Sequence, residues 1–549
     1  MTILDDLTPA ELGLPPRFDE FRQAQREMTE FGLYGPGSGS SSISSVDPSA
    51  SRRFIGIGGP AGSGKSLAAF ALGTLSGVKF ALLTATRTLE DQIVRDGFDC
   101  VNIRGKANYQ CKCNDNWTCE EGEEEDCRWC GTNQCTYSAQ VRLASAARAI
   151  PTNYQYWMHA RANNRMALER KGERIQLLIV DEAHLAMTNL SRYLATWISN
   201  QSLHQWAPVE SRTALVSTKG AEWGRVSVEW TNALTAVQIR VIARMSDIAS
   251  TYQSEAAAHR GSREYRRLDK LDRSLSTVLA HGADGNWIWK LTKAGVAFEC
   301  VWPGRYAERY LWSGVDRVVC MSATLRPKAM QLLGVRPDEY WFREWPRVFP
   351  AVNSPVYWVP TGRMGRKAGE EGLAASVARI DEIIAEWGHL KGIVHTPSYK
   401  LAEYYQAHSR YGRAMILNEG GGREKANDAA GKYRQCTTRP CVLVSPSFST
   451  GWDFPADAEG AWQVIPKLPF ADMTDPVVKA RMADDPEWYT YECMQQLVQA
   501  CGRQTRSETD KAVTFITDDL VKSFRFYGRS FAPKWWSVRD SKGVPGAPR

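Results

Sequence analysis

Short apolar runs alternate along most of the chain with segments whose apolar residues recur at helical spacing. A run without polar alternation predicts a strand that is covered on both faces, as in a parallel sheet. Such runs lie at Phe54–Gly58, Lys79–Thr86, Ile175–Val180, Arg317–Thr324, Gly392–Pro397, Cys441–Pro446 and Val513–Thr517. Helical spacing marks Leu67–Leu75, Ala375–Trp387 and Lys400–His408. Strands that alternate with helices predict doubly wound α/β domains.

Two segments interrupt this alternation. Residues 105–140 are rich in cysteine and include the acidic run Glu120–Asp126, whereas residues 186–310 are mostly helical in composition. The second segment also contains two runs that resemble strands, Asn286–Thr292 and Val296–Trp302. The α/β alternation restarts after it. The pattern therefore predicts two α/β units of similar size, the first of which carries two insertions.

Length and composition narrow the class of protein. A chain of 549 residues, 43% apolar and 23% charged, suits a soluble globular protein of about three to five domains and excludes disordered or fibrous classes. No apolar run is long enough for a membrane span, and the first residues lack a secretory signal, so we expect a cytoplasmic protein without a membrane partner. The net charge of +7 permits nucleic-acid binding without requiring it. Residues 36–51 predict a flexible linker, and the tail from about Ala532 is expected to fray.

One segment fits the phosphate-loop pattern G-x-x-x-x-G-K-[ST] at every fixed position: Gly59, Pro60, Ala61, Gly62, Ser63, Gly64, Lys65 and Ser66. It follows a predicted strand and precedes a predicted helix, a context that a chance glycine-rich turn lacks. The glycines let backbone N–H groups curl around phosphates, and the helix N-terminus adds the positive end of a dipole. Lys65 would reach the β- and γ-phosphates, and Ser66 would hold Mg²⁺.

Two carboxylates, Asp181 and Glu182, follow the predicted strand Ile175–Val180 in the sequence Asp-Glu-Ala-His. The carboxyl end of a buried strand is where a phosphate site needs its second metal-holding group. Asp181 would hold Mg²⁺ through water, and Glu182 would polarise the attacking water as general base. The simpler alternative is a helix N-cap without a catalytic role.

Six of the 13 cysteines fall within 25 residues, where even spreading would place about 0.6. They are Cys111, Cys113, Cys119, Cys127, Cys130 and Cys135. In a chain without an export signal, such a cluster predicts a metal site rather than disulfides. Taken alone, the C-x₂-C spacing of the pair Cys127 and Cys130 favours zinc.

Charged and aromatic residues add weaker hypotheses. The acidic run Glu120–Asp126 would repel nucleic acid, so we expect a solvated loop that is turned outward. Arg260–Arg273 spaces basic residues three and four apart, as in a solvated helix face or the lining of a single-strand passage. Core packing is the expected role of most tryptophans that could stack on bases, namely Trp197, Trp206, Trp287 and Trp289.

Further motifs lie before and after the phosphate loop and the Asp-Glu-Ala-His sequence. They are Arg22–Gln25, Thr84–Gln92, Arg104–Cys111, Cys135–Gln140, Thr152–Tyr154, Ser322–Thr324, Ser445–Pro455 and Gln499–Arg506. In this order the motifs resemble those of the superfamily 2 DNA helicases of the XPD–DinG group, which carry an iron–sulphur cluster. The resemblance extends over about residues 17–520.

The resemblance implies an α/β fold with two RecA-like motor domains and ATP between them. An iron–sulphur domain and a mainly helical arch domain would be inserted in the first motor domain. The expected limits are 1–104 for the first part of that domain, 105–140 for the iron–sulphur domain, 141–185 for the middle of the motor domain, 186–312 for the arch, 313–330 for the end of the motor domain, 331–531 for the second motor domain and 532–549 for a flexible tail.

The resemblance also implies roles for single residues. Gln25 would contact adenine, Gln499 would help to position the attacking water, and Asp453 would couple nucleotide to DNA. Arg503 and Arg506 would reach the phosphates from the second domain. An arginine supplied across a cleft stabilises charge on the transferring phosphoryl group only when the domains close. The alternative for these two arginines is a basic helix face.

The family has four ligating cysteines, whereas this segment offers six. Those expected to hold a [4Fe–4S] cluster are Cys111, Cys119, Cys127 and Cys135, with Cys113 and Cys130 as alternates. Zinc remains the alternative cofactor.

The function implied by the resemblance is an ATP-dependent DNA helicase that moves 5′→3′ on single-stranded DNA, with ATP and Mg²⁺. Single-stranded and forked DNA are the expected partners of a monomer that acts in the cytoplasm, or in the host cytoplasm if a phage encodes it. The alternative is a nucleic-acid-stimulated ATPase that acts as a clamp without unwinding duplex. A nuclease activity is not expected, because the segment before Gln25 is too short for a nuclease domain.

Overall fold

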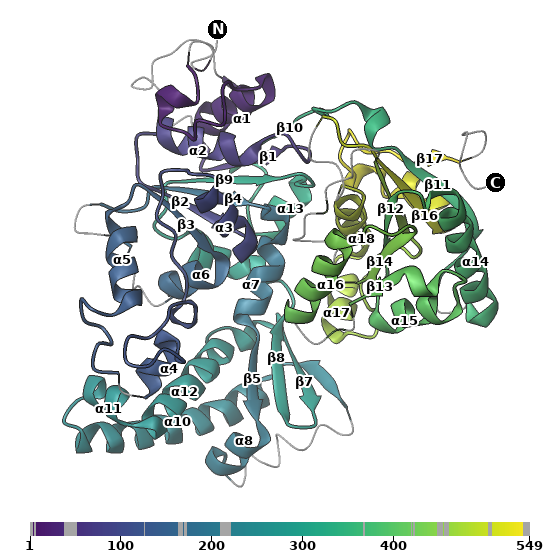
Figure 1. The fold of residues 1–549 in the computed structure, drawn as a ribbon. Helices are drawn as coiled ribbons and strands as arrows, with labels where there is room; N and C mark the ends of the chain where they lie inside the picture. The colour runs from purple at the N-terminus through teal and green to yellow at the C-terminus, as the bar shows by residue number, and fades with distance from the viewer. Residues whose placement is uncertain are drawn as a thin grey trace.

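The computed structural model describes residues 4, 7–37, 52–125, 127–162, 168–169, 173–208, 221–365, 368–418, 420, 423–446, 454, 460–502 and 508–541. Two α/β units lie side by side, and a helical unit hangs beneath the first (Figure 1). The predicted linker at 36–51 falls almost entirely outside the described residues.

The first α/β unit is built on six parallel strands within the described residues, in the order β10-β1-β9-β4-β2-β3. The strands are β1 (Phe54–Gly58), β2 (Phe80–Thr84), β3 (Ala149–Asn153), β4 (Leu177–Asp181), β9 (Arg317–Ser322) and β10 (Tyr340–Glu344). Its helices are α1 (Gln23–Tyr34), α2 (Lys65–Leu75), α3 (Arg87–Arg95), α5 (Thr136–Ala146), α6 (Tyr154–Ala162), α7 (Ala186–Leu194) and α13 (Pro327–Leu332). Every residue of β1 and β2 is buried, as expected for strands covered on both faces.

The second unit has seven described parallel strands, in the order β13-β14-β12-β15-β16-β11-β17. They are β11 (Val356–Gly362), β12 (Lys391–His395), β13 (Met415–Leu417), β14 (Cys441–Ser445), β15 (Ala461–Ile465), β16 (Ala512–Asp518) and β17 (Arg539–Asp540). The helices are α14 (Gly369–Trp387), α15 (Tyr399–His408), α16 (Arg423–Gln435), α17 (Pro476–Asp484), α18 (Pro486–Cys501) and α19 (Val521–Tyr527). The predicted fold class, two RecA-like α/β units with parallel sheets, is confirmed.

The two insertions differ in structure. The described residues of the cysteine-rich segment form the short helix α4 (Cys119–Glu124) and a 3₁₀ turn at Lys106–Asn108 among loops, before α5 begins at Thr136. The arch has the helices α8 (Asn200–Trp206), α10 (Val228–Thr251), α11 (Glu255–Gly261) and α12 (Arg263–His281). It also has an antiparallel sheet in the order β5-β8-β7-β6, formed by β5 (Thr196–Ser199), β6 (Trp223–Arg225), β7 (Trp287–Thr292) and β8 (Gly295–Cys300). Among the helices of the described residues, none is long and apolar enough to cross a membrane.

Two expected domain limits need correction. β10 pairs with β1 in the first sheet, from Phe54 with Tyr340 to Gly58 with Glu344, so the first motor domain extends past residue 330. The segment from Ala532 does not fray throughout, because Trp536 is buried and Arg539–Asp540 pairs with β11. Both errors have one cause: these short stretches are stabilised by contacts distant in sequence, which local composition does not reveal.

Candidate nucleotide site, metal centre and nucleic-acid cleft

The phosphate loop joins the end of β1 to the start of α2. Gly62 and Gly64 have φ angles of +74° and +76°, a region that glycine adopts without strain. The Lys65 ammonium donates hydrogen bonds to the carbonyl oxygens of Gly59 (3.0 Å) and Pro60 (3.2 Å), so it lies over the loop where phosphates would bind. The loop therefore has the backbone shape and the cation that a phosphate site needs.

Gln25 lies directly against this loop. A side-chain atom on Gly64 would collide with the Gln25 amide, which means that the glycine permits the contact. The Gln25 Oε1 atom accepts a hydrogen bond from the Arg22 N–H group (2.8 Å), and Arg22 Nη1 donates to the Gly62 carbonyl oxygen (3.1 Å). The start of α1 thus braces the phosphate loop. Arg22 is a contact that the sequence analysis did not assign.

Asp181 ends β4 beside the loop, and Glu182 follows with a left-handed φ of +49°. Burial and the neighbouring Glu182 charge raise the pKa of Asp181 to about 6, and Lys65 partly offsets them. A partly buried carboxylate beside the phosphate loop is well placed to hold a divalent cation. The expected pair of acids therefore lies where the phosphate loop needs it.

Ser322, at the end of β9, contacts both Glu182 and His184 of the Asp-Glu-Ala-His sequence. Its hydroxyl donates to Glu182 Oε2 (3.0 Å) and also lies 2.6 Å from His184 Nδ1. Because a serine hydroxyl has one hydrogen, His184 must supply the proton in the second bond. Glu182 is thereby held by a hydrogen-bonded relay rather than left as a simple helix cap.

The relay continues into the second motor domain. Gln499, buried near the end of α18, donates its Nε2 hydrogen to Thr324 Oγ1 at 2.9 Å. The Thr324 N–H group in turn donates to Ser322 Oγ (3.3 Å). Gly502, which follows α18, and Ala61 of the phosphate loop also approach each other between the two motor domains. The expected residues Asp453, Arg503 and Arg506 lie outside the described residues.

Five of the six clustered cysteines form two groups of sulphur atoms. Those of Cys111, Cys113 and Cys127 all lie within 4.8 Å of one another, and the Cys113 and Cys127 sulphurs are 2.7 Å apart. The Cys119 and Cys135 sulphurs are 4.0 Å apart. Each of the four expected ligands belongs to one of these groups, and Cys113, expected only as an alternate, belongs to the first as well.

The chemistry of these donors suits a thiolate-bound metal. Cys135 precedes α5, and although burial opposes the change, hydrogen bonds from Ser138 and Tyr137 lower its pKa. A lowered pKa favours the thiolate, the form that binds iron or zinc, whereas burial raises the pKa of Cys119 and, together with the neighbouring cysteines, raises that of Cys127 to about 12. Cys111 and Cys119 are buried as well. The residues therefore fit a soft metal ion or an iron–sulphur cluster.

The acidic run forms the short helix α4 rather than a loop, and Glu120, Glu121, Glu124 and Glu125 are exposed to solvent as expected. Glu125 forms an ion pair with Arg263 of the arch at 2.5 Å. Arg266 donates to the Glu124 carbonyl oxygen at 2.6 Å. These two contacts join the acidic run to the basic stretch, distant in sequence, where the cysteine-rich segment meets the arch.

A cleft of about 1540 Å³ runs between the first motor domain, the cysteine-rich segment, the arch and the second motor domain. Its basic side chains are Arg87, Lys106, Arg266, Lys270, Arg273, Arg309 and Arg434, and its tyrosines are Tyr137, Tyr154, Tyr156, Tyr193, Tyr310 and Tyr399. The stretch Arg260–Arg273 therefore lines a passage in part. Trp287 and Trp289 are buried in the core instead, whereas Trp197 is half-exposed.

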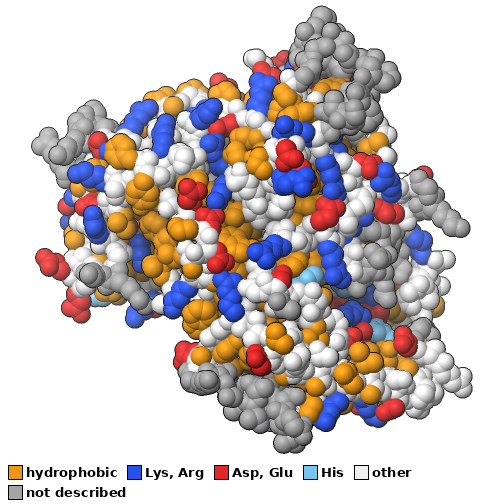
Figure 2. Space-filling view, turned by 180° about the vertical axis from the view of Figure 1, so that it is seen from behind, with side chains coloured by type: hydrophobic (Ala, Val, Ile, Leu, Met, Phe, Trp, Pro, Cys, Tyr) orange, Lys and Arg blue, Asp and Glu red, His pale blue; other side chains and the backbone are white. Residues whose placement is uncertain are grey.

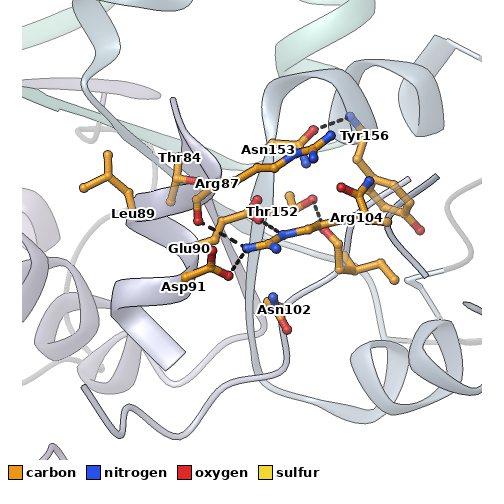
Figure 3. A network of polar contacts seen from close by, with 12 residues as sticks. Thr84, Arg87, Leu89, Glu90, Asp91, Asn102, Arg104, Thr152, Asn153 and Tyr156 are labelled. Carbon is orange, nitrogen blue, oxygen red and sulfur yellow. Dashed lines mark hydrogen bonds and ion pairs between the residues drawn. The ribbon is translucent and has the colours of Figure 1, made fainter. Parts of the chain in front are cut away.

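A buried ion pair connects the cysteine-rich segment to helix α3 of the first motor domain (Figure 3). Arg104, just before the cysteines, pairs with the fully buried Glu90 and with Asp91 of α3 (2.5 Å to Asp91). Burial raises the pKa of Glu90, and the hydrogen bonds from Arg104 and Asn153 oppose it. A buried acid without Arg104 would be costly, so this pair fixes the point at which the insertion leaves the motor domain.

Comparison with known proteins finds one matching family model and several solved structures with a similar fold. Residues 384–539 match the family model for the helicase C-terminal domain. A solved XPD helicase structure aligns with a TM-score of 0.62 at 13% identity, covering 95% of this chain and 100% of that chain. Xpd4 of S. tokodaii gives 0.56 at 13% identity, with 94% and 100% covered, and an apo XPD structure gives 0.57 at 14%, with 94% and 100% covered. At these identities the likeness shows the fold. No curated protein sequence matches the chain.

Proposed function

We propose that the chain is an XPD/DinG-like superfamily 2 helicase that couples ATP hydrolysis to unwinding of DNA, because residues 384–539 match the helicase C-terminal domain and the chain has the fold of solved XPD helicases. It moves 5′→3′ on the single strand. The observation that carries the proposal is the hydrogen bond between Gln499 and Thr324. It joins the two motor domains beside the phosphate loop, so a change at the nucleotide can alter how the domains meet.

In this proposal each residue of the nucleotide site has one task. Lys65 balances charge on the β- and γ-phosphates, while Ser66 and Asp181 hold Mg²⁺. Glu182 orients and deprotonates the attacking water, and Ser322 fixes its carboxylate. Gln499 positions that water when the domains close.

The remaining assignments of the nucleotide site rest on the resemblance. Gln25 contacts adenine beside the loop, and Arg503 and Arg506 stabilise the phosphoryl group from the second motor domain. Asp453 couples the nucleotide to DNA.

The single strand passes through the large cleft. Its arginines and lysines suit a phosphate backbone, and its partly exposed tyrosines, such as Tyr137, Tyr156 and Tyr399, supply faces on which bases stack. The carboxylates of Glu120, Glu123, Glu124 and Asp269 also line the cleft, so its lining is of mixed charge. The face shown in Figure 2 likewise carries lysines and arginines scattered among carboxylates and apolar residues.

The cysteine-rich segment holds a [4Fe–4S] cluster, with Cys111, Cys119, Cys127 and Cys135 as its ligands. The cluster supplies cross-links rather than a catalytic step. Zinc on the same thiolates is the alternative, and metal analysis of anaerobically purified protein separates the two: about four iron and four sulphide per chain supports the cluster, whereas one zinc without iron contradicts it.

A clamp that hydrolyses ATP without unwinding is the second candidate, because the nucleotide site would serve either activity. Strand displacement from a forked duplex, measured with ATP and with a non-hydrolysable analogue, distinguishes them. The helicase releases the strand only with ATP. Stimulated hydrolysis without strand release would favour the clamp, and no hydrolysis at all would contradict both.

A further inference from the structure

Among the described residues of the second motor domain, the short helix α17 packs directly against the arch. In α17, Val477 and Ala480 pack against Ile288 and Val301 of the arch in a single apolar cluster. The helix therefore belongs to the second motor domain in sequence but shares a buried surface with an insertion of the first.

Arg481 anchors this contact from within α17. Its Nε atom donates to the Val301 carbonyl oxygen (2.7 Å), and its Nη2 atom donates to Ser191 Oγ of α7 (2.9 Å). Its guanidinium carbon lies 5.2 Å from the ring centre of Trp488 and 5.8 Å from that of Trp302. One side chain thus joins the arch sheet, the helix that follows the Asp-Glu-Ala-His motif, and α18.

The other polar contacts around this anchor differ in exposure. Arg225 and Asp484 form an ion pair at 3.1 Å with side chains 40% and 37% exposed, whereas Lys290, 19% exposed, pairs with Asp475 at 3.0 Å and Lys328 of α13, 18% exposed, pairs with Asp485 at 2.7 Å. Exposed pairs contribute little to an interface, because water already solvates both charges. Arg481 is the side chain that contacts the arch, α7 and α18 at once, and Arg225 is a matched arginine of the same interface whose exposed pair contributes little.

α18 connects this anchor to the nucleotide site. The helix starts at Pro486, directly after α17, and its 16 residues span about 24 Å. Trp488 and Tyr491 are buried in the core cluster shared by the first motor domain and the arch. Near its other end, Gln499 donates to Thr324.

We propose that Arg481 is a positioning residue: it fixes the start of α18 to the arch and to α7, and through this rod it holds Gln499 against Thr324. Force that nucleic acid exerts on the arch is thereby transmitted to the nucleotide site. This inference rests on the proposed ATPase.

The first test replaces Arg481 by Met, which keeps a long side chain but removes the hydrogen-bond donors. DNA-stimulated kcat should fall about tenfold, while the KM for ATP changes less than about twofold, because Gln499 acts in the transition state rather than in ground-state binding. Arg481→Lys should restore part of kcat, and Arg225→Met should leave it unchanged. An equal loss in both arginine variants would overturn the proposal.

A double-mutant cycle provides the decisive readout. If Arg481 acts through Gln499, Arg481→Met combined with Gln499→Ala should lose no more kcat than Gln499→Ala alone. If Arg481→Met does not fold, as judged by circular dichroism, Arg481→Lys takes its place in the cycle. Losses that multiply would overturn the positioning role while leaving the ATPase intact. A wild-type chain without ATP hydrolysis would instead overturn the proposed function itself, and the positioning role with it.

Discussion

Around the phosphate loop, β1 and the middle of α2 are buried residue after residue, whereas between residues 105 and 135 the described segment buries only Cys111, Cys119, Gly122 and Cys135. The motor domain therefore fixes its catalytic groups with an apolar core. In its described residues the cysteine-rich segment has no such core, and under the proposed function a metal on its thiols holds the loops. A mutation should consequently damage chemistry alone in the first region, but local structure in the second.

Lys65→Ala should have the largest effect. Removing the ammonium that faces the phosphates should lower kcat for ATP hydrolysis by at least about a hundredfold, because a preorganised charge in the site is lost. DNA binding, measured by fluorescence anisotropy, should stay largely unchanged, since Lys65 contacts the loop and not the cleft. Normal turnover in a folded variant would contradict the site assignment.

Cys135→Ser should disrupt the cysteine-rich segment without disrupting the first motor domain. Serine is a poor ligand for soft iron, so the brown colour and the bound metal should be lost, as measured by visible absorbance and elemental analysis. Hydrogen exchange should rise in residues 105–135, while much of the basal ATPase should survive. Cys130→Ser is the control and should retain its full metal content; loss of metal there would show that the ligand set is wrong.

Thr324→Val should reduce the coupling between the motor domains. It keeps the shape of the side chain but removes the acceptor for Gln499, leaving a buried amide hydrogen without its partner. We expect about a tenfold fall in kcat with little change in the KM for ATP, measured by steady-state kinetics. Thr324→Ser retains the hydroxyl and should stay within about twofold of wild type. An unchanged kcat in Thr324→Val would remove this contact from the mechanism.

Acid should weaken magnesium binding through Asp181. With its pKa raised to about 6, the ionised fraction is about tenfold smaller at pH 5 than at pH 7, so Mg²⁺ affinity should fall across this range. In the metal-free protein, the raised pKa of Asp181 also affects folding. Between about pH 4 and pH 6 the native state keeps a proton on Asp181 that the unfolded state has lost, so the contribution of Asp181 to the free energy of unfolding declines as the pH rises through this range. Isothermal titration with Mg²⁺ and a non-hydrolysable ATP analogue measures the first effect, and Asp181→Asn should remove its pH dependence.

Arg263→Glu should have the smallest effect. The Arg263–Glu125 pair is largely exposed, so its loss should cost no more than about 1 kcal/mol. The affinity for single-stranded DNA should change less than about threefold, and Arg263→Glu with Glu125→Arg should recover the difference. A loss above tenfold would mean that the contact between arch and cysteine-rich segment does more than neutralise charge.

The sequence predicted the motor domains better than their borders. β1, β4 and β9 are continuous apolar runs, and the phosphate loop is a local motif, so both follow from neighbouring residues. β10 and β17 exist because they pair with strands distant in sequence, and the ion pair between α4 and α12 joins segments about 140 residues apart. The role of Arg481 in α17 has no local signature either. Such contacts depend on the assembled fold, which residue spacing does not encode.

Unwinding polarity tests the central claim most directly. A duplex with a 5′ single-stranded overhang and one with a 3′ overhang are incubated with the protein, Mg²⁺ and ATP, and the release of a labelled strand is followed over time. The account predicts ATP-dependent release from the 5′-overhang substrate and little from the 3′-overhang substrate. Release from the 3′-overhang substrate alone, or no release from either despite ATP hydrolysis, would contradict it.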